Sequence, residues 1–170
     1  MKYFMVKVTI FIVLMTIVFQ RSVGQINLHD GLYLIDELEI ASPEKTRLDT
    51  SKAIIHYNSA FIEGDPIDYA PISIWTNDYV PFDLRVEPST RPQTENKKLL
   101  LLTLTDKASE KLIEFTTKNV MKYVVIVVNG EALTVHRIKE PITSGLLQIT
   151  RCNDNACEQL FQVLKDHVKK

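Results

Sequence analysis

Along residues 99–165, the spacing of the hydrophobic residues switches between that of a strand and that of a helix. Residues 99–104 form a continuous apolar run, and residues 106–122 place apolar side chains on one side at the helical spacing. Thr105 supplies an N-cap, and Asp106 adds an acid to the first turn, where it complements the helix dipole. The pattern predicts a buried strand followed by a helix that covers a sheet. The apolar side of this helix is expected to hold Leu112, Ile113, Phe115, Thr116 and Val120.

Three more elements follow. Residues 123–128 are apolar and β-branched, and Asn129-Gly130 predicts a two-residue hairpin because both turn positions need positive φ. The return strand should run over 131–138, another strand over 146–151, and a helix from Asp154 or Asn155 to Val168. The order β-α-β-β-β-α indicates an α+β fold in which two helices pack on one face of a mixed or antiparallel sheet.

Residues 25–96 have a different texture from residues 97–170. They hold six of the seven prolines and short alternating runs between turn-formers. We expect a β-rich N-terminal part of the same domain, followed by an α+β subdomain. Trp75, Tyr79 and Phe82 are the best candidates for an exposed contact loop in the first part; alternatively, their rings pack this part onto the sheet, since large aromatic side chains are mostly buried.

The first 24 residues have the pattern of a secretory signal peptide. Lys2 and Lys7 precede an apolar run over 8–19, and small residues precede a cleavage point between Gly24 and Gln25. A single membrane anchor is the alternative, but the run is shorter than the roughly 20 residues that span a bilayer. We expect a periplasmic or secreted mature chain that does not span the membrane.

Composition and charge narrow the partners. The chain is 45% hydrophobic and 24% charged, which is typical of a folded domain. Cleavage would remove three basic residues and no acid, so 17 basic and 21 acidic residues would remain and the net charge would fall from −1 to −4. A mildly acidic surface disfavours nucleic acid. We expect the partner to be a protein or an extended polypeptide of the cell envelope.

Cys152 and Cys157 are the only cysteines, and an oxidising compartment would favour a disulfide between them. Two buried free thiols are the alternative. A zinc site with His136 or His167 would need four converging ligands, and the C-x4-C spacing matches zinc loops poorly. We predict neither a metal nor another cofactor.

The loop Glu140-Pro-Ile-Thr-Ser-Gly145 with Gln148-Ile-Thr150, preceded by the segment 114–122 and by Asn129-Gly130, resembles the head subdomain of the first periplasmic domain of SecD, the bacterial protein-export subunit. The family usually has glycine at the positions of Met121 and Arg151, and proline at that of His136. The motif positions are Asn119, Gly130, Glu140, Pro141, Ile142, Gly145, Gln148 and Ile149.

The resemblance implies a stand-alone periplasmic relative of the SecD head, without the transmembrane helices that couple a proton gradient to transport. It implies contact with an unfolded polypeptide or an envelope protein, linked to export. The motif residues also have a structural interpretation: Gly145 would permit a turn with positive φ, and Gln148 and Asn119 would tie loops to the sheet by hydrogen bonds.

No catalytic arrangement is evident, and we predict that the chain is not an enzyme. The histidines are scattered, and none lies in a nucleophile elbow or a metalloprotease helix. The alternatives to a binding or adaptor module are a secreted inhibitor or immunity-type protein with one folded partner, and a small hydrolase built on His136 or a cysteine. The histidines and the acids considered for a carboxylate pair are His29, His56, His136, His167, Asp30, Asp36, Glu37 and Glu39.

Overall fold

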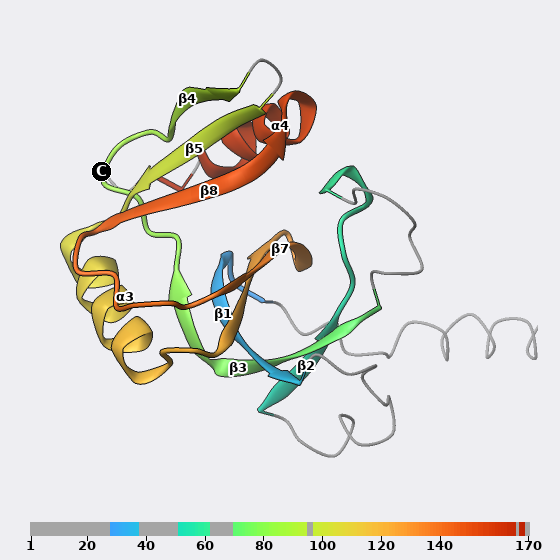
Figure 1. Cartoon of the computed structure of the whole chain (residues 1–170), viewed down its shortest axis with the longest axis vertical. Coiled ribbons are helices and arrows are strands. Elements are labelled where there is room, and N and C mark those ends of the chain that lie inside the picture. Colours follow the sequence, from blue (N-terminus) through green and yellow to red (C-terminus); the bar gives the residue numbers. More distant parts are fainter. Residues whose placement is uncertain (1–27, 38–50, 62–69, 95–96, 166, 169–170) are drawn as a thin grey trace, which may run out of the picture.

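The computed structural model describes residues 28–37, 51–61, 70–94, 97–165 and 167–168 (Figure 1). The predicted signal peptide lies outside these residues. The elements are β1 (Gly31–Glu37), β2 (Lys52–Ile55), the short helix η1 (Ser59–Phe61), β3 (Ile72–Pro81), β4 (Ser89–Thr94), β5 (Lys97–Thr103), α3 (Asp106–Lys118), β6 (Tyr123–Val128), β7 (Glu131–Arg137), β8 (Leu146–Asn153) and α4 (Asp154–Lys165).

The predicted α+β fold class is confirmed, and the strands divide between two sheets. One sheet has the order β2-β3-β1-β6-β7, and the other has the order β4-β5-β8; every strand pair is antiparallel. Strand β1 lies between β3 and β6, so it joins the N-terminal strands to the predicted hairpin. The division of the chain between residues 96 and 97 stays a prediction.

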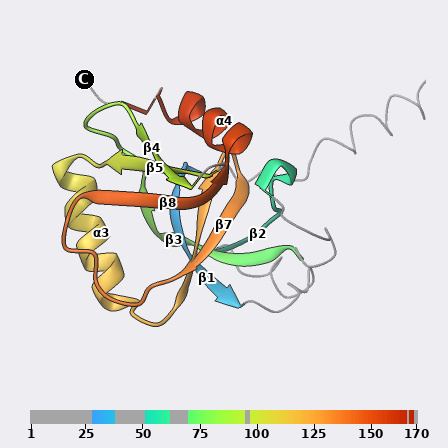
Figure 2. The same cartoon turned by 45° about the horizontal axis from the view of Figure 1, so that its top comes forward.

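The five-stranded sheet curls until its two ends meet. The chain after β2 reaches β7, where the Asn58 N–H donates to the Ala132 carbonyl and the Ala132 N–H donates to the His56 carbonyl, both at 2.8 Å. The curl gives the sheet an inner face, where Tyr33, Ile74 and other apolar residues cluster. The other face packs against both helices and the three-stranded sheet (Figure 2). The side chains buried between these elements form the larger core.

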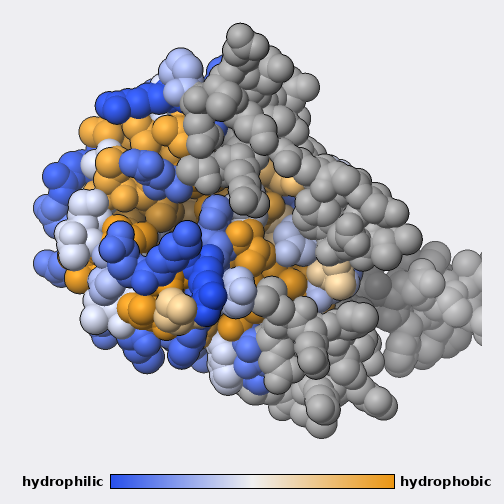
Figure 3. Space-filling model, in the orientation of Figure 1, coloured by the Kyte–Doolittle hydropathy of each residue, from blue (hydrophilic) through white to orange (hydrophobic). Residues whose placement is uncertain are grey.

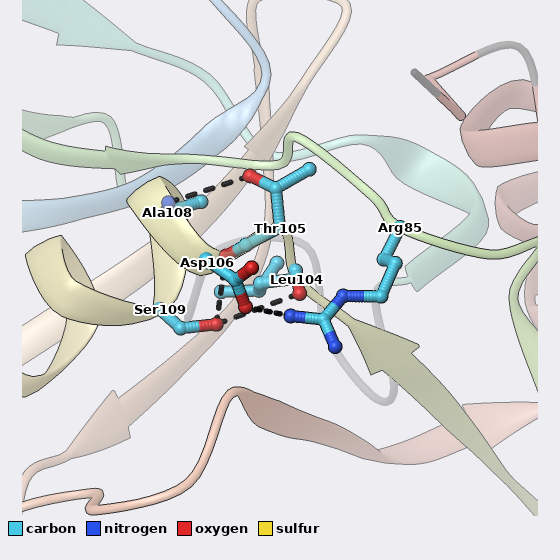
Figure 4. A network of polar contacts seen from close by, with 6 residues as sticks. All are labelled: Arg85, Leu104, Thr105, Asp106, Ala108 and Ser109. Carbon is cyan, nitrogen blue, oxygen red and sulfur yellow. Dashed lines mark hydrogen bonds and ion pairs between the residues drawn. The ribbon is translucent and has the colours of Figure 1, made fainter. Parts of the chain in front are cut away.

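Local signals set the hairpin and the start of α3 as predicted. Asn129 and Gly130 have φ of 53° and 77° between β6 and β7. Thr105 caps α3 by accepting a hydrogen bond from the Ala108 N–H at 3.4 Å. Asp106 lies in the first turn and forms an ion pair with Arg85, which reaches the helix from the segment after β3 (Figure 4).

The end of α3 differs from the prediction, because the helix stops at Lys118 rather than at residue 122. Both the backbone N–H and the side-chain amide of Asn119 donate to the Phe115 carbonyl, at 3.1 and 3.0 Å. This cap closes the helix. The buried face holds Ala108, Leu112, Phe115 and Thr116, whereas Ile113 and Val120 are 37% and 38% exposed, contrary to the prediction.

The C-terminal helix begins at Asp154, one of the two predicted starts, but ends at Lys165 rather than at Val168. It packs on β5 and β8, with Leu160 and Leu164 in the core. Cys152 lies near the end of β8 and Cys157 in the first turn of α4. Their side chains lie outside the described part of the structure, so the disulfide stays a prediction.

Candidate functional site

A groove of about 530 Å³ lies between β7 and β8. Figure 3 shows hydrophobic residues gathered around a recess on this face of the molecule, with hydrophilic residues at its margin. The lining residues come from β1, α3, β6, β7, β8 and the loop after β7: Leu32, Thr116, Val124, Ile126, His136, Arg137, Ile138, Lys139, Glu140, Ile142, Leu147 and Gln148.

The walls of the groove are the edges of two strands. Successive side chains of a strand point to opposite faces, so a groove that touches both Leu147 and Gln148 must run along the edge of β8. The same reasoning applies to His136 and Arg137 of β7. Each of these strands is the last in its sheet. The groove therefore separates the terminal strands of the two sheets.

The floor of the groove is one apolar face of the five-stranded sheet. Val124 and Ile126 are alternate residues of β6, and Leu32 is the register partner of Ile126 in β1. All three side chains are almost fully buried. Because alternate residues share a face, the floor is a continuous aliphatic surface between the two strand edges.

The loop over residues 138–145 forms one rim and is held in place by hydrogen bonds. The Ile142 N–H donates to Thr116 Oγ1 at 3.0 Å, and the Thr116 hydroxyl donates to the Leu112 carbonyl at 2.7 Å. The Leu104 N–H donates to the Gly145 carbonyl at 2.9 Å. These contacts fix the rim to α3 and to the end of the three-stranded sheet.

Gly145 is required in this loop by close packing and not by a positive φ. The positive-φ glycine among the described residues is Gly130, so Gly145 does not need the left-handed region. A Cβ at Gly145 would instead lie 2.1 Å from Ser109 Oγ and 3.0 Å from Ser109 Cβ. The expectation of a turn with positive φ is wrong, and close packing against α3 replaces it.

The rim carries more positive than negative charge. Arg137, Lys139 and Glu140 are exposed along it, and His136, which also lines the groove, is half-buried. Nε2 of His136 lies 2.8 Å from Thr134 Oγ1 on the same strand. Such a rim suits a ligand whose polar groups remain in water while its apolar groups reach the floor.

Three of the eight motif residues line the groove: Glu140, Ile142 and Gln148. Gln148 is exposed, and among the described residues its amide has no hydrogen-bond partner. The expectation that it ties a loop to the sheet is therefore not met within the described part. Its neighbour Ile149 is fully buried in the core.

The remaining motif residues are not among those that line the groove. Asn119 is fully buried as the cap of α3, and its Oδ1 accepts a hydrogen bond from Lys122 Nζ at 3.0 Å. Gly130 forms the hairpin turn, and Pro141 is exposed in the rim loop. These residues shape the scaffold around the groove.

The aromatic candidates belong to β3 and the residue after it rather than to a contact loop. Phe82 is 1% exposed, so its ring is core. Tyr79 stacks on Tyr33 with ring centroids 4.7 Å apart, and Lys111 Nζ lies 4.5 Å from the centre of the Tyr79 ring. Trp75 is half-buried beneath Lys52 Nζ at 4.4 Å. None of the three lines the groove.

The Tyr33 hydroxyl has a clearly displaced pKa. It donates to the His29 carbonyl at 2.7 Å. Burial is the main reason that the pKa of Tyr33 lies above its ordinary value of 10, and the adjacent Tyr79 phenol raises it further. This tyrosine lies in the core on the inner face of the curled sheet, so its role is structural.

The other titratable residues considered from the sequence are dispersed. His167 pairs with Asp30 at 2.9 Å, and Asp36 pairs with Lys52 at 2.8 Å. The side chains of Glu37 and Glu39 lie outside the part of the chain that the structure describes. Within the described residues, no cluster of three histidine, cysteine, aspartate or glutamate side chains is placed to hold a metal ion.

Comparison with known proteins identifies solved structures of similar fold. No family model matches the chain, and no curated protein matches it. A structure of SecDF, described as a membrane component that enhances protein export, matches with a TM-score of 0.50 and 16% identity over 88% of this chain and 68% of that chain. At this identity the likeness concerns the fold, which is SecD-like.

Two further SecDF structures are similar at lower scores. A super-membrane-facing form gives a TM-score of 0.48 at 18% identity and covers 82% of this chain. SecDF from Thermus thermophilus gives 0.40 at 14% identity and covers 83%. This chain spans only 18% and 29% of the length of those two proteins. Among the described residues, no helix has the length and apolar character needed to cross a membrane.

Proposed function

We propose that this protein is a non-catalytic module of the cell envelope that binds extended polypeptide in the groove between β7 and β8, and that this binding assists protein export. In this proposal the chain is exported by its N-terminal signal peptide and cleaved near Gly24 and Gln25. The partner is an unfolded or extended segment of another protein.

The observation that carries the proposal is the position of two strand edges above an apolar floor. An extended peptide can add to the edge of a sheet, where backbone hydrogen bonds provide affinity independent of sequence. Its alternate side chains would then face Leu32, Val124 and Ile126. Such a site favours apolar segments in general over any one sequence, as a protein that handles exported chains requires.

The groove has the volume of a small-ligand site, so it would hold a few side chains of an extended segment. Its volume of about 530 Å³ lies within the range of roughly 300–1,000 Å³ that is typical of small-ligand sites. The rim loop is already held by Thr116 and Leu104, so little of the binding free energy is lost in ordering it.

The fold likeness supports the link with export. The SecDF structure that matches over most of this chain is described as a membrane component that enhances protein export. Three of the residues by which the chain resembles the SecD head, Glu140, Ile142 and Gln148, line the groove. The proposal therefore places the shared motif at the binding site.

A peptide-binding experiment with one substitution in β8 tests the proposal. Gln148→Trp would fill the groove from an exposed strand position, and Ser89→Trp is its matched control. Both residues are register partners of Leu101, but Ser89 belongs to β4 on the opposite side of β5. The probe is a soluble fluorescent peptide in which apolar and polar residues alternate, and the readout is fluorescence anisotropy.

We expect Gln148→Trp to weaken binding by about tenfold or more, while Ser89→Trp binds like the natural chain. The same peptide N-methylated at every second residue should also bind poorly, because one of its edges cannot donate hydrogen bonds. Equal binding by the two tryptophan variants would contradict the proposal. Failure to bind any peptide, together with one-to-one capture of a single folded envelope protein, would favour an inhibitor or immunity-type protein.

A further inference from the structure

The turn after α3 exposes an unusual concentration of apolar side chains. Among the described residues, six large hydrophobic side chains are exposed, and four of these belong to α3, the turn that follows it and the first residue of β6. Val120, Met121 and Tyr123 are 38%, 55% and 40% exposed, and Ile113, within α3, is 37% exposed. Clustered exposed apolar residues mark interaction surfaces.

This turn is rigid. The Met121 N–H donates to the Ile138 carbonyl at 2.7 Å, and the Ile138 N–H donates to the Lys122 carbonyl at 3.0 Å. Nε of Arg137 donates to the Met121 carbonyl at 3.1 Å. Met121 has a φ of 69°, a conformation that glycine adopts far more readily. An exposed methionine thus occupies a position whose backbone conformation favours glycine.

Basic residues surround these apolar side chains. Lys122, Arg137 and Lys139 are exposed and are opposed within the turn and the adjoining rim by one acid, Glu140. The Lys122 ammonium group donates to the neutral amide of Asn119, and the Arg137 guanidinium lies 5.7 Å from the centre of the Tyr123 ring. No carboxylate contact is recorded for these three cations in the described part of the structure.

The neighbouring charges do not cancel this excess. Lys118, at the end of α3, is paired with Asp78 at 3.5 Å. Glu114 lies one turn earlier on the helix. The chain as a whole has a net charge of −1, so the local positive charge runs against the overall balance. A negatively charged partner is therefore favoured at this place.

We propose that this surface, the turn patch of Val120, Met121, Lys122, Tyr123, Arg137 and Lys139, docks on an anionic lipid bilayer. Apolar side chains that enter the interface, a tyrosine at headgroup level and flanking cations are the features by which proteins bind anionic membranes peripherally. The patch offers three exposed apolar side chains flanked by cations, which suits a fluid surface better than a folded partner.

Docking in this way would place the groove beside the membrane. Arg137 and Lys139 belong to both the turn patch and the groove rim. A bilayer held at the patch would therefore lie next to one end of the groove. The binding site for extended polypeptide would open close to the membrane surface.

Vesicle flotation tests the proposal. The protein is purified from the cell envelope after whatever processing of its N-terminus the cell carries out. The vesicles contain phosphatidylcholine alone, or phosphatidylcholine with phosphatidylglycerol as about a third of the lipid. Intact-mass measurement shows that all variants share one N-terminus, so differences in binding arise from the substitutions. The charge variant is Lys122→Gln with Lys139→Gln, and its control is Arg91→Gln with Lys107→Gln, two exposed cations elsewhere.

We expect binding only to the anionic vesicles, and a loss on the order of twentyfold in the charge variant, since each basic residue near an anionic surface contributes about fivefold. Met121→Gly should weaken binding by about fivefold, whereas Val86→Ser, a change of another exposed apolar residue, should not. Equal binding by the charge variant and its control, or equal binding to neutral vesicles, would overturn the proposal. The proposal would also be overturned if the patch variants still floated with the vesicles but no longer cross-linked to a protein, because the patch would then be a protein-binding surface.

Discussion

Gly145 and Ser109 are packed so closely that a Cβ on the glycine would lie 2.1 Å from Ser109 Oγ. The hydroxyl donates to the Thr105 carbonyl at 2.8 Å, an arrangement that holds it in place in the first turn of α3 (Figure 4). The Leu104 N–H donates to the Gly145 carbonyl from the other side. The rim loop of the groove is thereby clamped between the end of β5 and the start of α3.

The first prediction concerns this contact. Gly145→Ala should lower the free energy of unfolding by about 1–3 kcal/mol, and Gly145→Val by more, because the added atoms overpack a closed site. Urea denaturation measures the change. In a Ser109→Gly background the cost of Gly145→Ala should shrink, since both nearest atoms are then absent. A cost that is unchanged in that background would show that the contact is not its cause.

The second prediction concerns Met121, whose φ is 69°. Met121→Gly should raise the free energy of unfolding by about 0.5–1 kcal/mol, because relief of the left-handed conformation exceeds the added backbone entropy of glycine. Asn129→Gly is the control: its φ is 53°, but asparagine tolerates this region, so the effect should be smaller. Thermal unfolding of both variants would disagree with this account if Met121→Gly were the less stable.

Met121→Gly has a second use because its two expected effects have opposite signs. The variant should be more stable than the natural chain and should bind anionic vesicles less well. A loss of binding that accompanies a gain in stability cannot come from unfolding, so it would isolate the contribution of the exposed side chain.

The third prediction is alkaline destabilisation through Tyr33. Burial raises the pKa of Tyr33 above its ordinary value of 10. The folded chain therefore keeps this proton after the unfolded chain has lost it, and the associated stability is complete below pH 10 and falls as the pH rises toward the folded pKa. The slope should approach about 1.4 kcal/mol per pH unit.

Tyr33→Phe is the test. The variant should lose about 1 kcal/mol near neutral pH, where the hydrogen bond to the His29 carbonyl is missing, but should decline less steeply above pH 10. Urea denaturation at a series of pH values gives both quantities. A decline as steep in Tyr33→Phe as in the natural chain would assign the alkaline sensitivity to another group.

Local features of the fold could be predicted from the sequence because local interactions decide them. The Asn129-Gly130 turn and the Thr105 cap depend on the residues at those positions and formed as expected. The apolar spacing predicts a helix to residue 122, but α3 ends earlier because the backbone N–H and the side-chain amide of Asn119 both donate to the Phe115 carbonyl. Ile113 and Val120 then fell outside the buried face.

The division into two sheets could not be predicted in this way. Whether β6 pairs with β1 or with β5 depends on packing between segments distant in sequence, and every strand in question has a similar apolar pattern. The groove follows from that division. Leu32 and Ile126 have the pattern of ordinary core residues, and only the separation of β7 from β8 makes them a floor. The motif residues Glu140, Ile142 and Gln148 line this groove, although their pattern in the sequence does not predict a groove.

The last prediction concerns Asp30, which joins three distant parts of the chain. One carboxylate oxygen accepts a hydrogen bond from the Asn129 N–H at 2.7 Å, and the other lies 2.9 Å from Nε2 of His167. The Asp30 carbonyl also accepts from the Phe82 N–H at 3.0 Å. The side chain thus holds the hairpin tip and the segment after α4 against the start of β1.

Asp30→Ala should lower the free energy of unfolding by about 1–3 kcal/mol, because both side-chain contacts are lost. Asp30→Asn should be milder, since its side-chain carbonyl can still accept from the Asn129 N–H and its amide can donate to the His167 ring. If the carboxylate anchors the C-terminal segment, hydrogen exchange at the end of α4 should accelerate in Asp30→Ala, and adding His167→Ala should cost little more. Fully additive losses in the double variant would show that the two residues act independently and that the anchor lies elsewhere.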